Sequence, residues 1–286
     1  MFKILRKLRH KKEIKNLFIW NFLGQFYRFL IKLLPFNFYI NQKITNSFNF
    51  RLHAFFAFSN FNEWGNRHNN LFQTYLELCK KSKCFFDIGA HIGLVSLPAS
   101  TVMKNKGIVY SFEASPKNLF FLKYHIEINN IKNIKVVEKL VSSENKIENH
   151  FFESKEPSGM NSIINLKNKR ITKYKKVQSI SLDNFCKKNN IIPELIKVDI
   201  EGSEIKMLIG SKKIIKKYKP IIFLSYHPEH IKKLGYSKKR IFQILKELRY
   251  QIFDSNVMVP RILTNNEYLL VPNNYNVKKI LNEEKV

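Results

Sequence analysis

From Lys83 onward, short apolar runs alternate along the chain with amphipathic segments. The apolar runs are rich in β-branched and aromatic residues, as buried strands are. The segments between them repeat their apolar residues at helical spacing. The expected strands are Cys84–Ile88, Ile108–Phe112, Ile134–Leu140, Leu195–Asp199, Ile221–Tyr226 and Gln251–Asp254, and the expected helices are Leu94–Met103, Pro116–Asn130, Leu182–Asn189, Ser203–Lys217 and Ser237–Leu248. This alternation predicts an α/β fold, with a mostly parallel sheet flanked by helices.

The N-terminal part has a different pattern. An apolar run from Leu17 to Leu34 is interrupted by polar residues at 21, 25, 28 and 32, which share one helical stripe. Seven Lys and Arg residues, all between Lys3 and Lys15, precede this apolar run, and no small-residue cleavage site follows it. We therefore expect an amphipathic helical extension rather than a signal peptide or a spanning helix. Residues 1–35 then contact an anionic membrane surface peripherally or pack on the rest of the protein.

The domain limits follow from these patterns. Residues 1–70 form the basic helix and an irregular extension, 71–272 form the main domain and 273–286 form a flexible tail. Residues 143–180 are a long insertion, which we expect to form a hairpin or lid beside the ligand site. The Trp64–Asn70 stretch lines a polar pocket or forms a turn that caps a helix over Leu71–Lys81, and we favour the turn.

Composition adds a strong positive charge of +28, from 50 Lys and Arg against 22 Asp and Glu. Only nine of these basic residues are Arg, the residue that reads phosphate and bases best. The charge therefore reflects a Lys-rich surface as readily as a nucleic-acid partner. The three cysteines show neither disulfide nor zinc spacing, so we expect a cytoplasmic protein, with or without contact to the membrane face.

Candidate chemistry begins after the first expected strand of the sheet, in the loop from Asp87 to Gly93. Gly89 and Gly93 allow a tight turn close to a ligand, but their spacing does not match the dinucleotide fingerprint. Glu113 ends the next strand, where an acid can accept hydrogen bonds from two ribose hydroxyls. Its structural alternative is to cap the helix that starts at Pro116. The loop and the acid together favour an adenosine-bearing cofactor.

A second cluster follows the fourth and fifth strands. Asp199, Glu201 and Glu204 are close in sequence at one strand end, where their charges repel unless a partner relieves them. His227 follows the neighbouring strand and can act as a general base beside these acids. It can also lie in a surface loop without a role. Asp199, Glu201 and His227 could hold a divalent ion, which we do not favour.

The chain resembles the FkbM family of S-adenosylmethionine-dependent methyltransferases. The resemblance rests on FFDIGAHIGLVS, FEASPKNLFFLKYHIEIN, SLDNF, IKVDIEGSEIKMLIG and KPIIFLSYH, which span roughly residues 85 to 254 in the family's order. It implies a class I methyltransferase sheet, which is Rossmann-like. The sequence departs from the family's usual pattern at Ala90-His91, Ala114-Ser115 and Ser225.

The resemblance also implies roles for particular residues. Asp87, Gly89, Ala90 and Gly93 would shape the pocket for the methionine part of S-adenosylmethionine, Glu113 would bind the ribose, and Val141 and Ser142 would flank the adenine. The catalytic candidates are Asp199, His227, Glu201 and Glu204. The expected activity is O-methylation of a hydroxyl on a sugar, a glycan precursor or a related small metabolite. The alternatives are a basic RNA-binding protein or RNA methyltransferase, which we do not favour, and a membrane scaffold.

Overall fold

The computed structural model describes residues 18–34, 36–45, 47–62, 64–65, 69–163 and 171–277. The predictions for the basic segment before the first helix, for Arg67 and His68, and for the end of the tail lie outside these residues.

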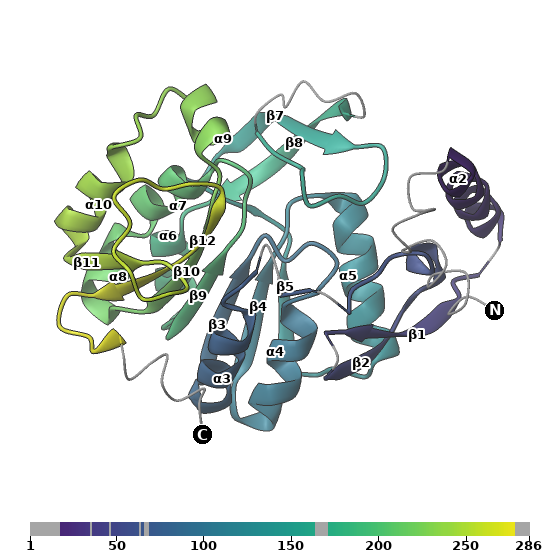
Figure 1. Ribbon diagram of the computed structural model, residues 1–286, viewed down its shortest axis with the longest axis horizontal. Coiled ribbons are helices and arrows are strands. Elements are labelled where there is room, and N and C mark those ends of the chain that lie inside the picture. Colours follow the sequence, from purple (N-terminus) through teal and green to yellow (C-terminus); the bar gives the residue numbers. More distant parts are fainter. Residues whose placement is uncertain are drawn as a thin grey trace.

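A seven-stranded sheet forms the centre of the molecule (Figure 1). Its strands, in spatial order, are β11 (Tyr250–Phe253), β12 (Asn266–Pro272), β10 (Ile221–Tyr226), β9 (Leu195–Val198), β3 (Cys84–Ile88), β4 (Ile108–Phe112) and β5 (Ile134–Val137). The five strands from β10 to β5 run parallel, whereas β12 is antiparallel to both of its neighbours. The expected α/β fold with a mostly parallel sheet is confirmed.

Helices cover both faces of this sheet. One face carries α6 (Leu182–Asn189), α7 (Glu204–Gly210), α8 (Lys212–Tyr218) and α10 (Arg240–Leu248), and the other carries α3 (Phe72–Lys81), α4 (Ser96–Met103) and α5 (Pro116–Ile128). A short helix, α9 (Pro228–Lys233), follows β10 directly. Every residue of β3, β9 and β10 is buried, as expected for strands covered on both faces.

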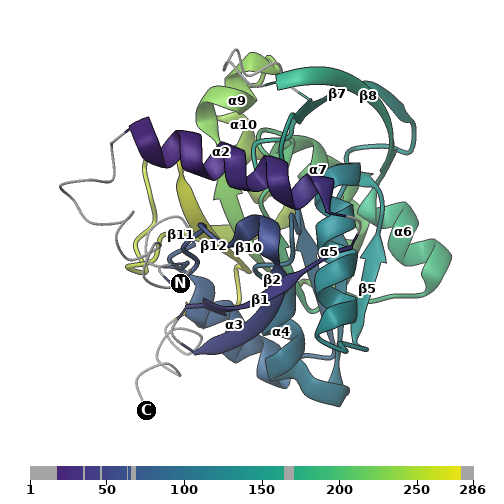
Figure 2. The ribbon, with the colours of Figure 1, turned by 90° about the vertical axis from the view of Figure 1, so that its right-hand side faces the viewer.

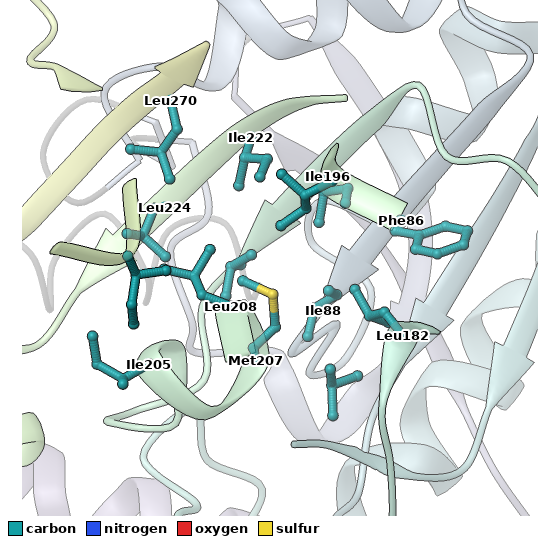
Figure 3. Close-up of a cluster of buried hydrophobic side chains, with 14 of the residues drawn as sticks. Phe86, Ile88, Leu182, Ile196, Ile205, Met207, Leu208, Ile222, Leu224 and Leu270 are labelled. Atoms are coloured by element: carbon teal, nitrogen blue, oxygen red, sulfur yellow. The ribbon is translucent and has the colours of Figure 1, made fainter. Parts of the chain in front are cut away.

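The core on the α7 side is built from alternate strand residues. Figure 3 shows Ile196 of β9, Ile222 and Leu224 of β10 and Leu270 of β12 above Ile205 of α7 and its neighbours. Each labelled side chain is less than 1% exposed. Burial of such a side chain contributes about 1.5 to 3 kcal/mol, so this layer is a major source of the sheet's stability.

Three segments differ from the sequence-based expectation. Strand β12 was not predicted, because its apolar run is short and begins with the polar pair Asn266-Glu267. The helix expected over Ser203–Lys217 is broken at Ser211, whose hydroxyl bonds to the carbonyl of Met207. The strand expected over Ile134–Leu140 ends at Val137, and Leu140–Val141 forms β6 in a different sheet.

The segment expected to be irregular contains a hairpin instead. Strands β1 (Tyr39–Ile44) and β2 (Phe48–His53) pair antiparallel, and a 3-10 turn over Ala54–Phe56 follows. The backbone NH of His53 donates to Nε2 of His125 on α5 at 2.9 Å. The ring of His125 bonds through Nδ1 to the carbonyl of Ile92 at 2.8 Å, and burial lowers its pKa to about 4. A neutral, buried histidine therefore ties this hairpin to the main domain.

The insertion also forms a hairpin. Strands β7 (Ile147–Ser154) and β8 (Ile171–Ile180) pair antiparallel, and β8 continues beside β6. This hairpin projects from one end of the molecule, at the top of Figure 1. Ser115 Oγ, at the start of α5, donates to Glu153 Oε1 at 2.6 Å and so attaches β7 to the domain.

The first described helix, α2 (Phe18–Leu33), has the amphipathic sequence expected. It lies along the outside of the molecule, above β1 and β2 in the view of Figure 2. Within the described part of the chain, no helix is both long and apolar enough to span a bilayer.

Candidate active site

A cavity of about 490 Å³ opens at the carboxyl ends of the parallel strands. It reaches from the glycine loop after β3 and the end of β4 to the ends of β9 and β10. Ligands bind in this position in open α/β sheets. The two candidate clusters found in the sequence therefore share one cavity.

The glycine loop after β3 is held tightly against β9. Gly89 and Gly93 have φ values of 86° and 96°, which only glycine adopts without strain. A Cβ on Gly89 would collide with the backbone carbonyl of Asp199, so this position requires glycine for space as well. Gly89 and Ala90 line the cavity, whereas Gly93 is not among its lining residues and packs against Leu122.

Glu113 presents a buried carboxylate to the cavity at the end of β4. Its oxygens accept hydrogen bonds from the backbone NH groups of His91 at 2.8 Å and Ser115 at 2.8 Å. Burial raises the pKa of Glu113 to about 7, although these hydrogen bonds oppose the shift. Ser115 caps α5 by accepting from the NH of Asn118, so the alternative role of Glu113 as the helix cap is wrong.

Of the three other residues suggested for the cofactor, only one reaches the cavity surface. Val141 lines the cavity. Ser142 is buried, does not line it, and packs its carbonyl against Gly210. Asp87 lies behind the wall and accepts a hydrogen bond from Ser96 Oγ at 2.5 Å. Asp87 therefore supports the glycine loop from behind, and the structure does not bring it or Ser142 to the cavity surface.

At the other end of the cavity, Asp199 is paired with a buried lysine. Lys197 Nζ lies 3.0 Å from Asp199 Oδ2, and the Lys197 side chain is only 2% exposed. Burial acts to raise the pKa of Asp199, but Lys197 and His227 outweigh it and lower this pKa. Asp199 is therefore an ionised carboxylate at neutral pH, with Oδ1 3.7 Å from His227 Nε2.

His227 is held among three carboxylates. Its Nδ1 lies 2.5 Å from Glu204 Oε1, and its Nε2 lies 3.7 Å from both Asp199 Oδ1 and Glu201 Oε2. Burial disfavours the charged ring, but the hydrogen bond and charge of Glu204, with Glu201 and Asp199, raise the pKa of His227 to about 9. The ring is protonated at neutral pH and cannot accept a hydroxyl proton there. This differs from the role of general base expected from the sequence.

The acids themselves have separate positions. Glu204 is fully buried, does not line the cavity, and accepts from the NH of Gly202 at 3.1 Å as well as binding His227. Glu201 lines the cavity and lies 2.9 Å from His230 Nδ1. Glu204 is thus placed to orient His227, whereas Asp199 and Glu201 can reach a bound molecule.

The same cluster has the geometry of a possible cation site. The ligand atoms of Asp199, Glu201 and His227 all lie within 4.8 Å of one another, close enough to share one divalent ion. An ion bound there would have to replace the proton on His227, because a ligating imidazole is neutral. The protonated ring already offsets the repulsion between the acids.

A buried polar cluster at the cavity wall, centred on Lys197, was not predicted. Lys197 is paired in register with Asp87 on β3, and both are buried. Burial acts to lower the pKa of Lys197, but Asp199, Asp87 and Glu267 together raise it. Glu267 on β12 is fully buried and accepts from the NH of Leu71 at the start of α3 at 2.9 Å. The sequence did contain a sign of this role, because Lys197 is the only charged residue in the buried strand β9.

The loop of the second hairpin completes the cavity wall. Residues 158–163 line it, and the Asn118 side chain bonds to the backbone of Ser158 through both its amide nitrogen and its oxygen. Ser162 Oγ donates to the carbonyl of Glu201 at 2.7 Å. The insertion therefore lies beside the candidate acceptor end, as the sequence analysis expected of a hairpin or lid.

The Trp64–Asn70 stretch also contributes to the cavity. Trp64 and Asn69 line it, whereas Asn70 bonds to Ser255 Oγ at 3.1 Å. Leu71, the N-cap residue of α3, makes no capping bond with its own side chain, and its NH donates to the Glu267 side chain. The NH of Phe72 donates to the carbonyl of Asn69 at 3.0 Å, so a turn precedes α3 as we favoured, while Trp64 and Asn69 also line the cavity, as the pocket alternative expected.

Several lining residues carry polar atoms without a partner. The atoms are Trp64 Nε1, Asn69 Oδ1, His91 Nε2, Asn161 Nδ2 and Ser225 Oγ. Each is buried and has no hydrogen-bond partner within the described part of the chain. Buried polar atoms without partners are costly, so these atoms mark where a polar ligand is expected.

Comparison with known proteins agrees with the sequence motifs. The model of the family described as "Methyltransferase FkbM domain" matches residues 87–252, more than half of the chain. No curated protein matches the chain.

Solved structures with similar backbones include three methyltransferase folds. Methyltransferase FkbM from Methylobacillus flagellatus KT is 21% identical over 66% of this chain and 43% of its own, with a TM-score of 0.42. The S-adenosylmethionine-dependent methyltransferase from Agrobacterium tumefaciens is 8% identical over 84% and 72%, with a TM-score of 0.44. TYW2 from M. jannaschii, solved with S-adenosylmethionine, is 12% identical over 84% and 86%, with a TM-score of 0.39.

This chain thus spans less than half of the Methylobacillus protein. The sequence match over residues 87–252 is decisive, and it shows that the chain belongs to the FkbM methyltransferase family.

Proposed function

We propose that this protein is an S-adenosylmethionine-dependent O-methyltransferase that acts on a hydroxyl of a sugar, a glycan precursor or a related small metabolite. Family membership supports the transfer of a methyl group. The observation that carries the acceptor class is the row of unpaired polar atoms in the cavity, close to ionised Asp199.

The cofactor end of the cavity suits S-adenosylmethionine. The Gly89 turn leaves no room for a Cβ, which keeps the backbone close to whatever occupies the cavity. Glu113 offers a carboxylate that could accept hydrogen bonds from two ribose hydroxyls. Leu140 and Val141 provide apolar surface for the adenine. When bound, S-adenosylmethionine supplies an electrophilic methyl group.

The acceptor end suits a molecule with several hydroxyls. Trp64 Nε1 and Asn161 Nδ2 are donors, Asn69 Oδ1 is an acceptor, and the Ser225 hydroxyl can do both. A sugar presents donors and acceptors around a compact ring, so it could satisfy these groups together. A purely apolar acceptor would leave them unpaired, at the cost of a buried polar group for each.

We assign proton removal to Asp199. Its carboxylate lines the cavity, is ionised, and pairs with buried Lys197, which lines the cavity as well. Such general-base help contributes about 10²- to 10⁴-fold to the rate of a reaction that must lose a proton. Protonated His227 then stabilises the ionised acids and, with Glu204 fixing its ring, is available to donate a hydrogen bond from Nε2. This scheme uses no divalent cation.

RNA as the acceptor is less well supported. Asp199 and Glu201 lie at the acceptor end of the cavity, where they would repel phosphate. The scarcity of Arg points in the same direction.

The test follows labelled methyl groups from S-adenosylmethionine into free hexoses, nucleotide sugars and RNA. We expect label in a sugar, with a methoxy signal in the product's NMR spectrum. Asp199→Asn should abolish transfer and leave cofactor binding, measured by calorimetry, unchanged. The matched control is Glu229→Gln, an exposed acid two residues after His227 that does not line the cavity. Label in RNA alone, or unchanged turnover by Asp199→Asn, would refute the proposal.

A further inference from the structure

Helix α2 packs on the molecule through a narrow, mixed face and leaves most of its large apolar side chains exposed. The residues turned toward the body are Gly24, Tyr27, Arg28 and Ile31, which are buried or partly buried. Most amphipathic surface helices instead turn an apolar stripe inward and leave polar residues in water. Helix α2 departs from this rule, because its largest apolar side chains are exposed.

Polar contacts hold the helix in this orientation. Tyr27 OH donates to the carbonyl of Ala54 at 3.0 Å, and Arg28 Nε bonds to Glu156 on the insertion hairpin at 3.2 Å. The charged groups of Arg28 and Lys32 lie 5.7 and 5.6 Å from the centre of the Phe55 ring. Of the polar stripe that the sequence predicted, Arg28 is therefore partly buried, whereas Gln25 and Lys32 remain exposed.

The outward side is a row of large apolar residues that we name the α2 surface. Its members are Phe22, Phe26, Phe29, Leu30 and Leu33, which are 41% to 64% exposed together with their neighbours Leu23 and Leu34. Phe22, Phe26, Phe29 and Leu33 follow the spacing of a single helical face. Nothing in the described part of the chain covers this row, although a contiguous apolar patch normally marks an interaction site.

Length and charge indicate what covers it. A helix of 16 residues is about 24 Å long, shorter than the roughly 30 Å hydrocarbon core of a bilayer. Such a helix can lie in the membrane interface but not span it. The sequence before α2 contains seven Lys and Arg residues against the single acid Glu13. Positive charge beside an exposed apolar stripe complements an anionic lipid surface.

We propose that the α2 surface docks this methyltransferase on an anionic lipid bilayer, with the phenylalanine side chains inserted among the acyl chains. A second copy of the chain is a weaker occupant, because dimerisation there would bring together two basic N-terminal segments in molecules of charge +28 each. Because Arg28 bonds to Glu156, docking also places the hairpin that walls the cavity near the membrane.

The experiment uses the full chain and co-sedimentation with vesicles. Wild type should bind phosphatidylcholine vesicles that contain phosphatidylglycerol, bind pure phosphatidylcholine weakly, and lose affinity as salt is raised. The triple variant Phe22→Ser/Phe26→Ser/Phe29→Ser should bind anionic vesicles at least about tenfold more weakly, because it loses most of the buried apolar area.

The control variant removes as much exposed apolar surface elsewhere. Met258, Val259 and Ile262, in the segment between β11 and β12, are 64%, 64% and 70% exposed. Their triple change to Ser should leave vesicle binding unchanged. Both variants should bind S-adenosylmethionine like wild type, which shows that they fold and separates this test from that of the proposed function.

Any of three results would overturn the proposal. In the first, wild type fails to bind anionic vesicles, and in the second, the α2 variant binds them as wild type does. In the third, neither protein binds vesicles, and light scattering shows a wild-type dimer but a monomeric α2 variant, which would make a second copy the occupant.

Discussion

The protonation of Glu113 should control how tightly the protein binds its cofactor. Burial raises the pKa of this carboxyl to about 7, so the free protein exists in both forms near neutral pH. Only the ionised form can accept hydrogen bonds from both ribose hydroxyls while it also accepts from His91 and Ser115. Cofactor affinity should therefore rise with pH through this range.

The magnitude follows from the pKa. At pH 5.5 only about 3% of the carboxyl groups would be ionised, so the apparent affinity for S-adenosylmethionine should be about 30-fold weaker than at pH 8.5. Glu113→Gln mimics the protonated acid. A 30-fold loss corresponds to about 2 kcal/mol, within the range for one hydrogen bond to a charged group. The variant should bind at every pH at least as weakly as wild type binds at pH 5.5, about 30-fold or more below wild type at pH 8.5.

Isothermal titration calorimetry of S-adenosylmethionine from pH 5.5 to 8.5 measures both curves. They should converge at low pH and separate at high pH. Glu138→Gln is the matched control, since Glu138 is exposed and pairs with Lys123 on the surface. A flat wild-type curve, or equal affinities of wild type and Glu113→Gln at pH 8.5, would show that Glu113 does not bind the ribose in this way.

Three further predictions concern residues in the cavity wall and next to it. Gly89→Ala should abolish cofactor binding, because its Cβ would collide with Asp199, while Gly24→Ala, outside the cavity and with room for a Cβ, should bind normally in the same titration. Lys197→Met should lower the free energy of unfolding, measured in urea, by about 3 kcal/mol or more, because it leaves buried carboxylates without their partner. A loss below about 1 kcal/mol, the value of an exposed ion pair, would contradict the pairing.

The third prediction in this group concerns Glu267, whose pKa burial raises to about 7 from an ordinary value of 4.5. A raised carboxyl pKa means that the folded state holds its proton more tightly than the unfolded state. Its contribution to stability is therefore present below about pH 4.5 and is lost as pH rises through 7. Glu267→Gln lacks this loss, so between pH 4.5 and 8 its stability in urea should gain about 3 kcal/mol relative to wild type; parallel pH profiles would contradict it.

Much of the fold could be predicted, because its strands and helices are long enough to show their periods. The predictions failed where tertiary contacts outweighed local pattern. Strand β12 exists because it pairs with β10 and β11, although its own sequence begins with Asn266-Glu267. The β1–β2 hairpin was hidden by its polar residues, yet it is stabilised by its bond to buried His125.

The candidate site shows the same division. The motifs placed Asp199, Glu201 and His227 at one end of the sheet, since neighbouring parallel strands end side by side. They could not show that Glu204 lies behind His227, because this depends on how α7 begins after β9. They also could not assign a protonation state, which depends on burial and on charges from three elements.

The sequence by itself determined the α/β architecture, the methyltransferase family and the amphipathic nature of α2, because each follows from the types and spacing of residues close together in the chain. Only the tertiary structure decided which way α2 faces, that Lys197 holds Asp199, and that Ser142 lies away from the cavity. These features depend on contacts between segments far apart in the chain. Their free energy comes from burial and from pairing of charges, and neither quantity belongs to any one stretch of sequence.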